Sequence, residues 1–157
     1  MAGWIDPIFD RTQADVDFAI RKIEEWKATD GSLAYDLKGC INASDLNRIE
    51  QDITYLSERL ADFLYTPDTV SKEWSVSGMP TAQDIERILY NAKSLVSSFH
   101  RHPDAPDVPL GLSRYEDLNA LEKNLYLIRE LLETMVSSFK KSGTFYSGST
   151  FSLPIGR

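Results

Sequence analysis

Asn42-Ala43-Ser44-Asp45-Leu46 is a helix opening, and the chain contains this pattern four times. A residue whose side chain can cap a helix is followed three residues later by an acid, which is the layout of a capping box. The cap accepts a backbone N–H that has no helical partner, and the acid is favoured at the positive end of the helix dipole. The pattern therefore predicts four helices. The other openings begin at Thr12, Thr81 and Ser113, with Asp15, Asp84 and Glu116 as their acids.

An apolar stripe with steps of three and four residues follows each opening, and such a stripe predicts a helix with one buried face. Four such helices can bury their faces only against one another. The predicted fold class is all-α: a four-helix bundle built of two helix hairpins, with helices at about 12–28, 43–65, 81–100 and 114–141. The stripes are Val16, Ala19, Ile23 and Trp26; Leu46, Ile49, Ile53, Leu56, Leu60 and Phe63; Ile85, Ile88, Ala92, Leu95 and Phe99; and Leu118, Leu121, Leu125, Ile128, Leu132, Met135 and Phe139.

Apolar segments flank the predicted bundle on both sides. Residues 1–11 form an apolar N-terminal arm, which we expect to pack across the bundle or against another chain. Residues 144–157 are rich in β-forming residues and indicate a short β-like tail, either a hairpin or an extended arm, with a disordered terminus as the alternative. The predicted division is one domain over 1–143, followed by the tail. The candidates for partner binding are Trp4, Ile8, Phe9, Trp74, Phe145, Tyr146 and Phe151.

The three tryptophans have different predicted places. Trp26 continues the stripe of the first helix and is expected in the core. Trp4 and Trp74 lie outside the predicted helices, and two interpretations stay open for them. They plug the ends of the bundle, or they anchor a partner, because aromatic residues concentrate at interfaces.

The string Asp-Leu-Asn-x-(Ile/Leu)-Glu occurs twice, at 45–50 and at 117–122. It indicates either an ancient duplication of a helix pair or the convergence of capped helices on similar starts. Glu50 and Glu122 close the two strings. We expect them to form ion pairs with Arg or Lys on neighbouring turns.

The composition argues against several classes of function. The formal charge is −7, and residues 1–78 hold 15 acids and 8 bases, so an acidic surface disfavours nucleic-acid binding. Cys40 is the only cysteine and cannot form an internal disulfide. The N-terminus has no signal-peptide pattern, and no apolar run approaches the ~20 residues of a membrane span. We expect a cytoplasmic protein without a membrane partner.

No motif for chemistry accompanies the four helices. His100 and His102 are the only histidines, and their position at the end of the third helix is typical of C-terminal capping rather than metal binding. A carboxylate-bridged di-metal bundle needs Glu-x-x-His on two helices, and that pattern is absent. The sequence has no Gly-x-Ser-x-Gly elbow and no Walker-type phosphate loop. We therefore expect no enzymatic activity, no cofactor and no metal.

Several stretches resemble a module of bacteriophage and prophage structural proteins from gut-dwelling Firmicutes, often encoded among tail or baseplate genes. They are Asn42–Glu50 with Tyr55-Leu56, Arg11–Val16, Trp74 with Pro80–Ile85 and Leu89–Asn91, and Tyr146–Gly148. The fourth helix departs from the pattern, with Asp117–Glu122 where an Ala-Asn-x-Ile-Glu core is expected.

The resemblance implies a non-enzymatic virion structural or assembly protein that is incorporated into the virion after cytoplasmic assembly. Its partners would be other virion proteins, and it would form homo-oligomers in the symmetric virion. The alternative is a host adaptor or regulatory bundle that binds an unknown protein. No catalytic residue transfers with the resemblance, because the shared motifs are structural caps.

Overall fold

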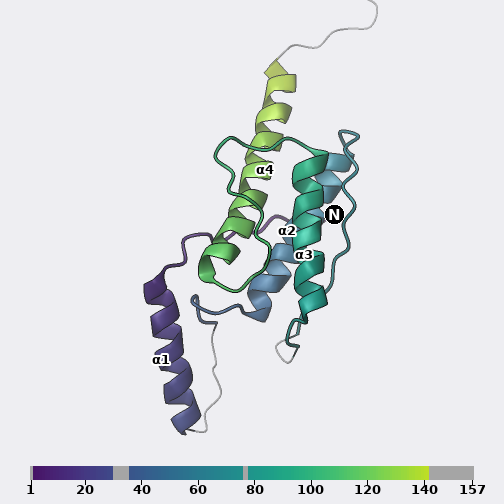
Figure 1. The fold of residues 1–157 in the computed structure, drawn as a ribbon. Coiled ribbons are helices and arrows are strands. Elements are labelled where there is room, and N and C mark those ends of the chain that lie inside the picture. The colour runs from purple at the N-terminus through teal and green to yellow at the C-terminus, as the bar shows by residue number, and fades with distance from the viewer. Residues whose placement is uncertain (1, 30–35, 76–77, 142–157) are drawn as a thin grey trace, which may run out of the picture.

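The computed structural model describes residues 2–29, 36–75 and 78–141, and its architecture is all-α (Figure 1). The helices are α1 (Gln13–Thr29), α2 (Ala43–Ala61), α3 (Ala82–Ser98) and α4 (Tyr115–Lys141). The predicted all-α class is confirmed, and each helix begins within a few residues of its predicted start. No strand occurs within the described ranges. The predicted β-like tail at 144–157 lies outside the described residues.

The capping residues predicted from the sequence start the first three helices. The Thr81 N–H donates to Asp84 Oδ2 at 3.0 Å, and the Asp84 N–H donates back to Thr81 Oγ1 at 3.2 Å. The hydrogen bond from the Thr81 backbone, with Lys72 beside the carboxylate, lowers the pKa of Asp84 to about 2. Thr12 and Asn42 likewise donate their backbone N–H to the acid three residues on, at 2.8 and 3.0 Å.

The fourth opening uses a different acid from the one predicted. The N–H groups of Ser113 and Arg114 donate to Asp117 Oδ2 at 3.1 and 3.0 Å, whereas Glu116 is exposed. The prediction of Glu116 as the capping acid was wrong, because α4 begins at Tyr115 and Asp117 is therefore its third residue. Asp117 opens the second copy of the duplicated string, as Asp45 opens the first.

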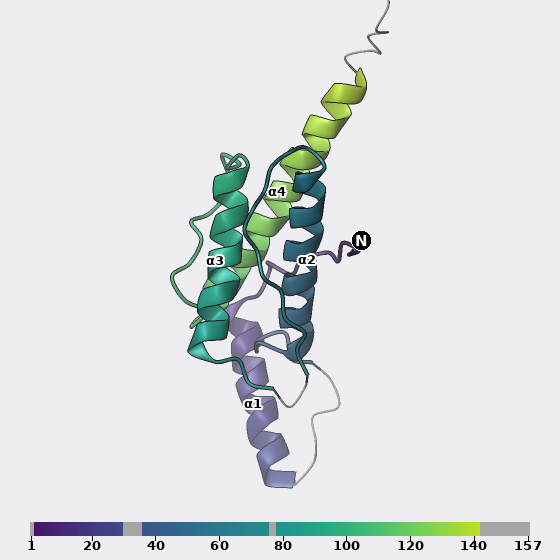
Figure 2. The ribbon, with the colours of Figure 1, turned by 90° about the vertical axis from the view of Figure 1, so that its right-hand side faces the viewer.

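Three helices form the core. The extensive helix contacts join α2 to α4, α3 to α4 and α2 to α3 (Figure 2). Most residues of their predicted stripes are buried, and Leu56 and Leu125 are fully inaccessible to solvent. Phe63, Ile85 and Met135 are half-buried, and Phe139 is 62% exposed, so its predicted place on the buried face of α4 was wrong. Helix α2 ends four residues before the predicted position, because Leu64 takes a left-handed conformation with φ of 67° and Tyr65 donates its N–H back to the Leu60 carbonyl at 3.1 Å.

Helix α1 leaves this core and projects from one end of the molecule, while the last turns of α4 project from the other (Figures 1 and 2). Of the apolar stripe predicted on α1, only Ala19 is buried. Trp26 is 38% exposed, so the expectation that it lies in the core was wrong. The apolar stripe therefore forms one face of α1, but the described bundle leaves most of that face uncovered.

Candidate interaction surfaces

The N-terminal arm, residues 2–11, lies extended across α2 and reaches α4. Side chains of α2 hold its first half: the Ala2 N–H donates to Glu58 Oε2 at 3.0 Å, and Gln51 Nε2 donates to the Gly3 carbonyl at 2.7 Å. Its second half is held through the Ile8 N–H, which donates to Glu122 Oε2 at 2.8 Å. The arm contributes backbone groups and the helices contribute polar side chains, so the docking needs no strand partner.

A buried cluster of four charges fixes the end of the arm. Arg11, Asp45, Arg48 and Glu122 are 3%, 4%, 8% and 0% exposed. Arg11 Nη2 and Arg48 Nη2 both donate to Asp45 Oδ1, at 2.9 and 2.6 Å. Arg11 Nη1 donates to Glu122 Oε1, and Arg48 donates to both Glu122 oxygens, each at 2.9 Å. Two cations face two anions, which lets the cluster lie in the interior.

The pKa shifts follow from this pairing. Burial acts to raise the pKa of Asp45, but hydrogen bonds from the Asn42 backbone and from Arg48 outweigh it and hold that pKa below its ordinary value. Burial acts to lower the pKa of Arg48, but Glu122 and Asp45 raise it above its ordinary value. Asp45 and Arg48 therefore stay charged at neutral pH and serve as structural ion-pair partners.

Asp52 on α2 is a carboxyl of this region whose pKa is raised. It is 1% exposed, and its Oδ1 accepts the Ile5 N–H at 3.0 Å. Burial raises the pKa of Asp52 to about 7, against the lowering effect of the Ile5 hydrogen bond. Glu122 and Asp6 add to the rise, and Arg48 opposes it. This contact between arm and bundle therefore titrates near neutral pH.

Asparagine side chains clamp the extended segments to the helices. The Arg11 N–H donates to Asn119 Oδ1 at 3.2 Å, and Asn119 Nδ2 donates to the Arg11 carbonyl at 2.9 Å. Asn47 makes the same two bonds to the backbone of Trp74, at 2.8 and 2.9 Å. Asn91 makes them to Val70, at 3.1 and 2.8 Å. Each asparagine side chain thus satisfies both the backbone N–H and the backbone carbonyl of one residue, as the backbone of a neighbouring β-strand would.

The duplicated string therefore has one structural role in both copies. Its asparagine, Asn47 or Asn119, clamps an extended segment, and its glutamate accepts arginine. Glu50 accepts from Arg87 Nη1 at 3.0 Å and from the Trp74 indole at 3.3 Å. The expected pairing of Glu50 and Glu122 with neighbouring turns was wrong, because both glutamates face inward and meet arginines from other elements. Sequence reasoning missed this cluster, although the repeated asparagine and glutamate were its visible signal.

The residues predicted to bind a partner fall into three groups. Trp4, Ile8 and Phe9 are half-buried in the arm; the Trp4 ring lies 5.6 Å from Tyr55, and Phe9 lies 5.3 Å from Tyr126. The arm thus packs across the bundle, the first of its two predicted alternatives. Trp74 is 7% exposed and belongs to the core cluster, which favours its role as a plug. The remaining candidates, Phe145, Tyr146 and Phe151, lie outside the described residues.

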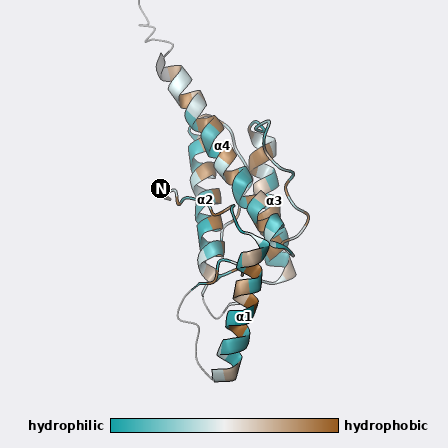
Figure 3. Ribbon diagram, turned by 90° about the vertical axis from the view of Figure 1, so that its left-hand side faces the viewer, coloured by the Kyte–Doolittle hydropathy of each residue, from teal (hydrophilic) through white to brown (hydrophobic). Residues whose placement is uncertain are grey.

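Part of the exposed apolar surface lies on α1. At 3.6 residues per turn, Val16, Ala19, Ile20, Ile23 and Trp26 fall within an arc of about 120° of its circumference. Ile20 is 50% exposed and Trp26 is 38% exposed. Figure 3 shows hydrophobic segments along α1, away from the three-helix core. A continuous apolar face of this kind on a projecting helix is typical of an interaction surface.

A groove continues this face onto the bundle. Its volume is about 760 Å³, and it lies between α1, the segment that precedes α2 and the segment that precedes α3. The apolar part of its lining includes Ile23, Leu37, Ile41, Met79 and Pro80. Gly39 lets the segment before α2 approach α1, because a Cβ on Gly39 would lie 2.2 Å from the Asp15 carbonyl oxygen.

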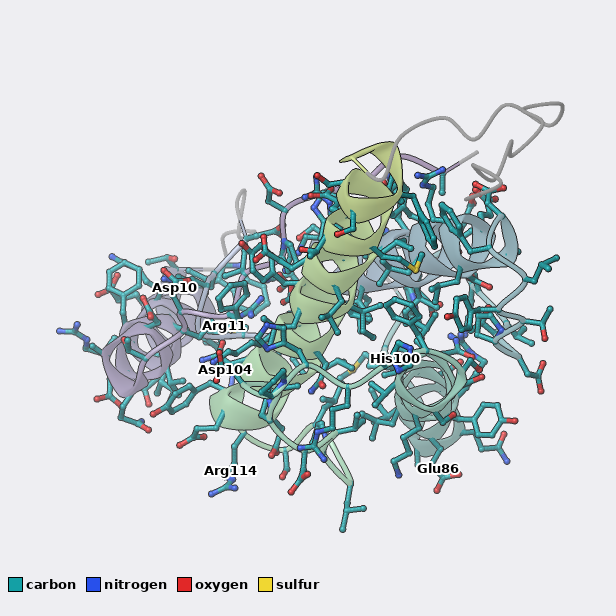
Figure 4. All side chains as sticks on the ribbon, turned by 90° about the horizontal axis from the view of Figure 1, so that it is seen from above. Asp10, Arg11, Glu86, His100, Asp104 and Arg114 are labelled. Carbon is teal, nitrogen blue, oxygen red and sulfur yellow. The ribbon has the colours of Figure 1, made fainter. Side chains whose placement is uncertain are left out.

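Within the described ranges, neither a cluster of metal ligands nor a membrane-spanning helix is present. Within them, no group of three or more His, Cys, Asp or Glu side chains could hold a metal ion. None of the four helices is long and apolar enough to cross a bilayer. His102 lies half-buried after α3. The ring of His100, which is labelled in Figure 4, lies 6.4 Å from the ring of Tyr65. Comparison with protein-family models, with curated proteins and with solved structures finds no match to this chain.

Proposed function

We propose that this protein is a non-enzymatic, phage-derived virion structural or assembly protein, associated with the tail or baseplate, that acts through protein–protein contacts. The observation that carries the proposal is the apolar face of α1, defined by Val16, Ala19, Ile20, Ile23 and Trp26. The sequence of α1 is that of an amphipathic helix, yet Ala19 is the one residue of this apolar face that is buried. Such a face on a helix that projects from the core is suited to bind a helix or an extended segment of another protein.

The structural roles of the phage-like motifs support the same proposal. Asn42 with Asp45 caps a helix, Arg11 joins the buried ion cluster, and Thr81 with Asp84 caps another helix. Each of these polar residues is used to hold the fold. A well-packed three-helix core that carries a projecting apolar helix face is suited to a scaffold or connector.

The test is incorporation into particles. In a host that carries the gene, the prophage is induced, the particles are purified on a density gradient, and the protein is detected with an antibody. We expect it to co-sediment with tails or intact virions, and the double variant Ile20→Ser, Trp26→Ser to be lost from them. Phe18→Ser is the matched control, because Phe18 is 45% exposed but lies on the opposite face of α1.

Two results would contradict the proposal. The first is absence of the wild-type protein from every particle fraction while it remains in the host lysate, which would favour the host adaptor. The second is incorporation of the double variant at the wild-type level, which would exclude the α1 face as the docking element.

A further inference from the structure

We propose that two copies of this chain associate head to tail, with residues 142–157 of one copy docked on the α1 face and the adjoining groove of the next. This deepens the proposed function, since it names the occupant of the α1 surface. The two elements lie at opposite ends of the molecule: α1 projects from one end and the last turns of α4 from the other (Figures 1 and 2). An interface between unlike surfaces of identical copies is heterologous, and it builds rings or filaments.

The reach of the segment argues for a second copy over the same chain. From Asn119, where the arm ends, α4 runs about 33 Å to Lys141 at 1.5 Å per residue. In the other direction, α1 runs about 15 Å from Gln13 to Ile23. The path from Lys141 to Ile23 on the α1 face therefore approaches 50 Å, and 16 fully extended residues span at most about 55 Å. Docking on the α1 face of the same chain would use almost the whole segment as linker, whereas docking on the α1 face of a second copy leaves it free to bind.

Charge complementarity favours the same pairing. Residues 142–157 carry Arg157 and no acidic side chain, and Lys140 and Lys141 directly precede them. Residues 10–36, which include α1, carry seven acids and four bases. A basic end that meets an acidic end speeds association and disfavours contact between like ends. The association should therefore weaken as the salt concentration rises.

The chemistry of the segment also suits the groove. Phe145, Tyr146 and Phe151 supply aromatic side chains, which are frequent energetic anchors of interfaces. The groove offers aliphatic and thioether surface from Ile23, Ile41 and Met79, of which Met79 is 89% exposed. Methionine adapts readily to an aromatic partner.

The experiment is a complementation of two variants, each defective in one half of the interface. The acceptor-defective chain carries Ile20→Ser and Trp26→Ser, and the donor-defective chain lacks residues 142–157. Sedimentation velocity should show concentration-dependent association of the wild-type chain, weakened at least tenfold between 50 and 500 mM salt, and monomers for each variant alone. An equimolar mixture of the two variants should form one-to-one dimers and nothing larger. Phe18→Ser should associate like the wild type.

Several outcomes would overturn the inference. The inference would be wrong if the wild-type chain stayed monomeric at high concentration. It would also be wrong if the chain without residues 142–157 associated like the wild type, or if the mixture of the two variants stayed monomeric. A deletion that lowers the melting temperature of the monomer would indicate docking within one chain, which also contradicts it. Failure here is distinguishable from failure of the proposed function. A monomeric protein that is still incorporated into particles would support the proposed function without the head-to-tail association. A head-to-tail oligomer that is absent from particles would support the association without the proposed function.

Discussion

Replacement of Glu122 by glutamine should break the buried ion cluster that holds the arm. Glu122 is fully buried and accepts hydrogen bonds from the Ile8 N–H, from Arg11 and twice from Arg48. The substitution keeps the shape but removes one of two anions, so two guanidinium groups remain against Asp45 alone. Removal of one partner from a buried ion pair costs about 3–5 kcal/mol. For a chain of this size, that loss lowers the melting temperature by roughly 6–20 °C.

Thermal and urea denaturation followed by circular dichroism would measure this loss. The matched control is Glu86→Gln, since Glu86 is exposed on α3 (Figure 4) and should change the free energy of unfolding by less than about 0.5 kcal/mol. A double-mutant cycle separates pairing from packing. The double variant Arg11→Met, Glu122→Met leaves Arg48 paired with Asp45. Its loss of unfolding free energy should therefore be smaller than the sum of the losses of the two single variants by about 0.5–3 kcal/mol. If Glu122→Gln matched its control, the cluster would not hold the arm.

The remaining predictions concern the core, the titrating carboxyl, metal and the tryptophans. Leu56→Ala and Leu125→Ala should each cost about 2–5 kcal/mol, and unchanged denaturation midpoints would refute the assigned core. Asp52 has a pKa near 7 in the fold against 3.8 ordinarily, so its stabilising contribution is full below about pH 4 and is lost as the pH rises toward 7. Asp52→Asn should therefore flatten the dependence of the melting temperature on pH between about pH 4 and 7, and an unchanged pH profile would contradict this. Treatment with a chelator should leave the melting curve in place, whereas a lower midpoint restored by one added metal would reveal a metal site. Trp74→Ala should cost at least about 3 kcal/mol and Trp26→Ser less than about 1 kcal/mol, and a reversed order would exclude the observed placement of α1.

The local structure could be predicted from the sequence because its causes are local. A capping residue and an acid three positions on, as in Thr81 and Asp84, are enough to start a helix at that position. The same signal misled at Ser113, where two acids follow one another and only the geometry of the first turn selects Asp117 over Glu116. The buried stripes of α2, α3 and α4 were likewise predictable, since periodicity states which face of a helix avoids water.

The tertiary partners of polar residues could not be predicted in the same way. Glu122 meets Arg11 across 111 positions of sequence, and no spacing rule covers such a distance. The asparagine clamps are hidden for the same reason, because Asn119 binds the backbone of the arm and places no demand on the side chain there. A polar residue repeated on an inward face is the available signal, and it indicates burial without naming the partner.

Helix α1 shows what an amphipathic pattern establishes. The stripe from Val16 to Trp26 indicates a face that is favoured out of water, and it says nothing about which molecule covers that face. Three helices are packed around one core, and the extensive helix contacts of the described bundle do not include α1. Among the described residues, the apolar face of α1 is left largely uncovered, and the partner that we propose for it is the segment that follows Lys141 of a second copy. An amphipathic helix that lies outside the core of its own chain leads us to predict that another chain packs against it.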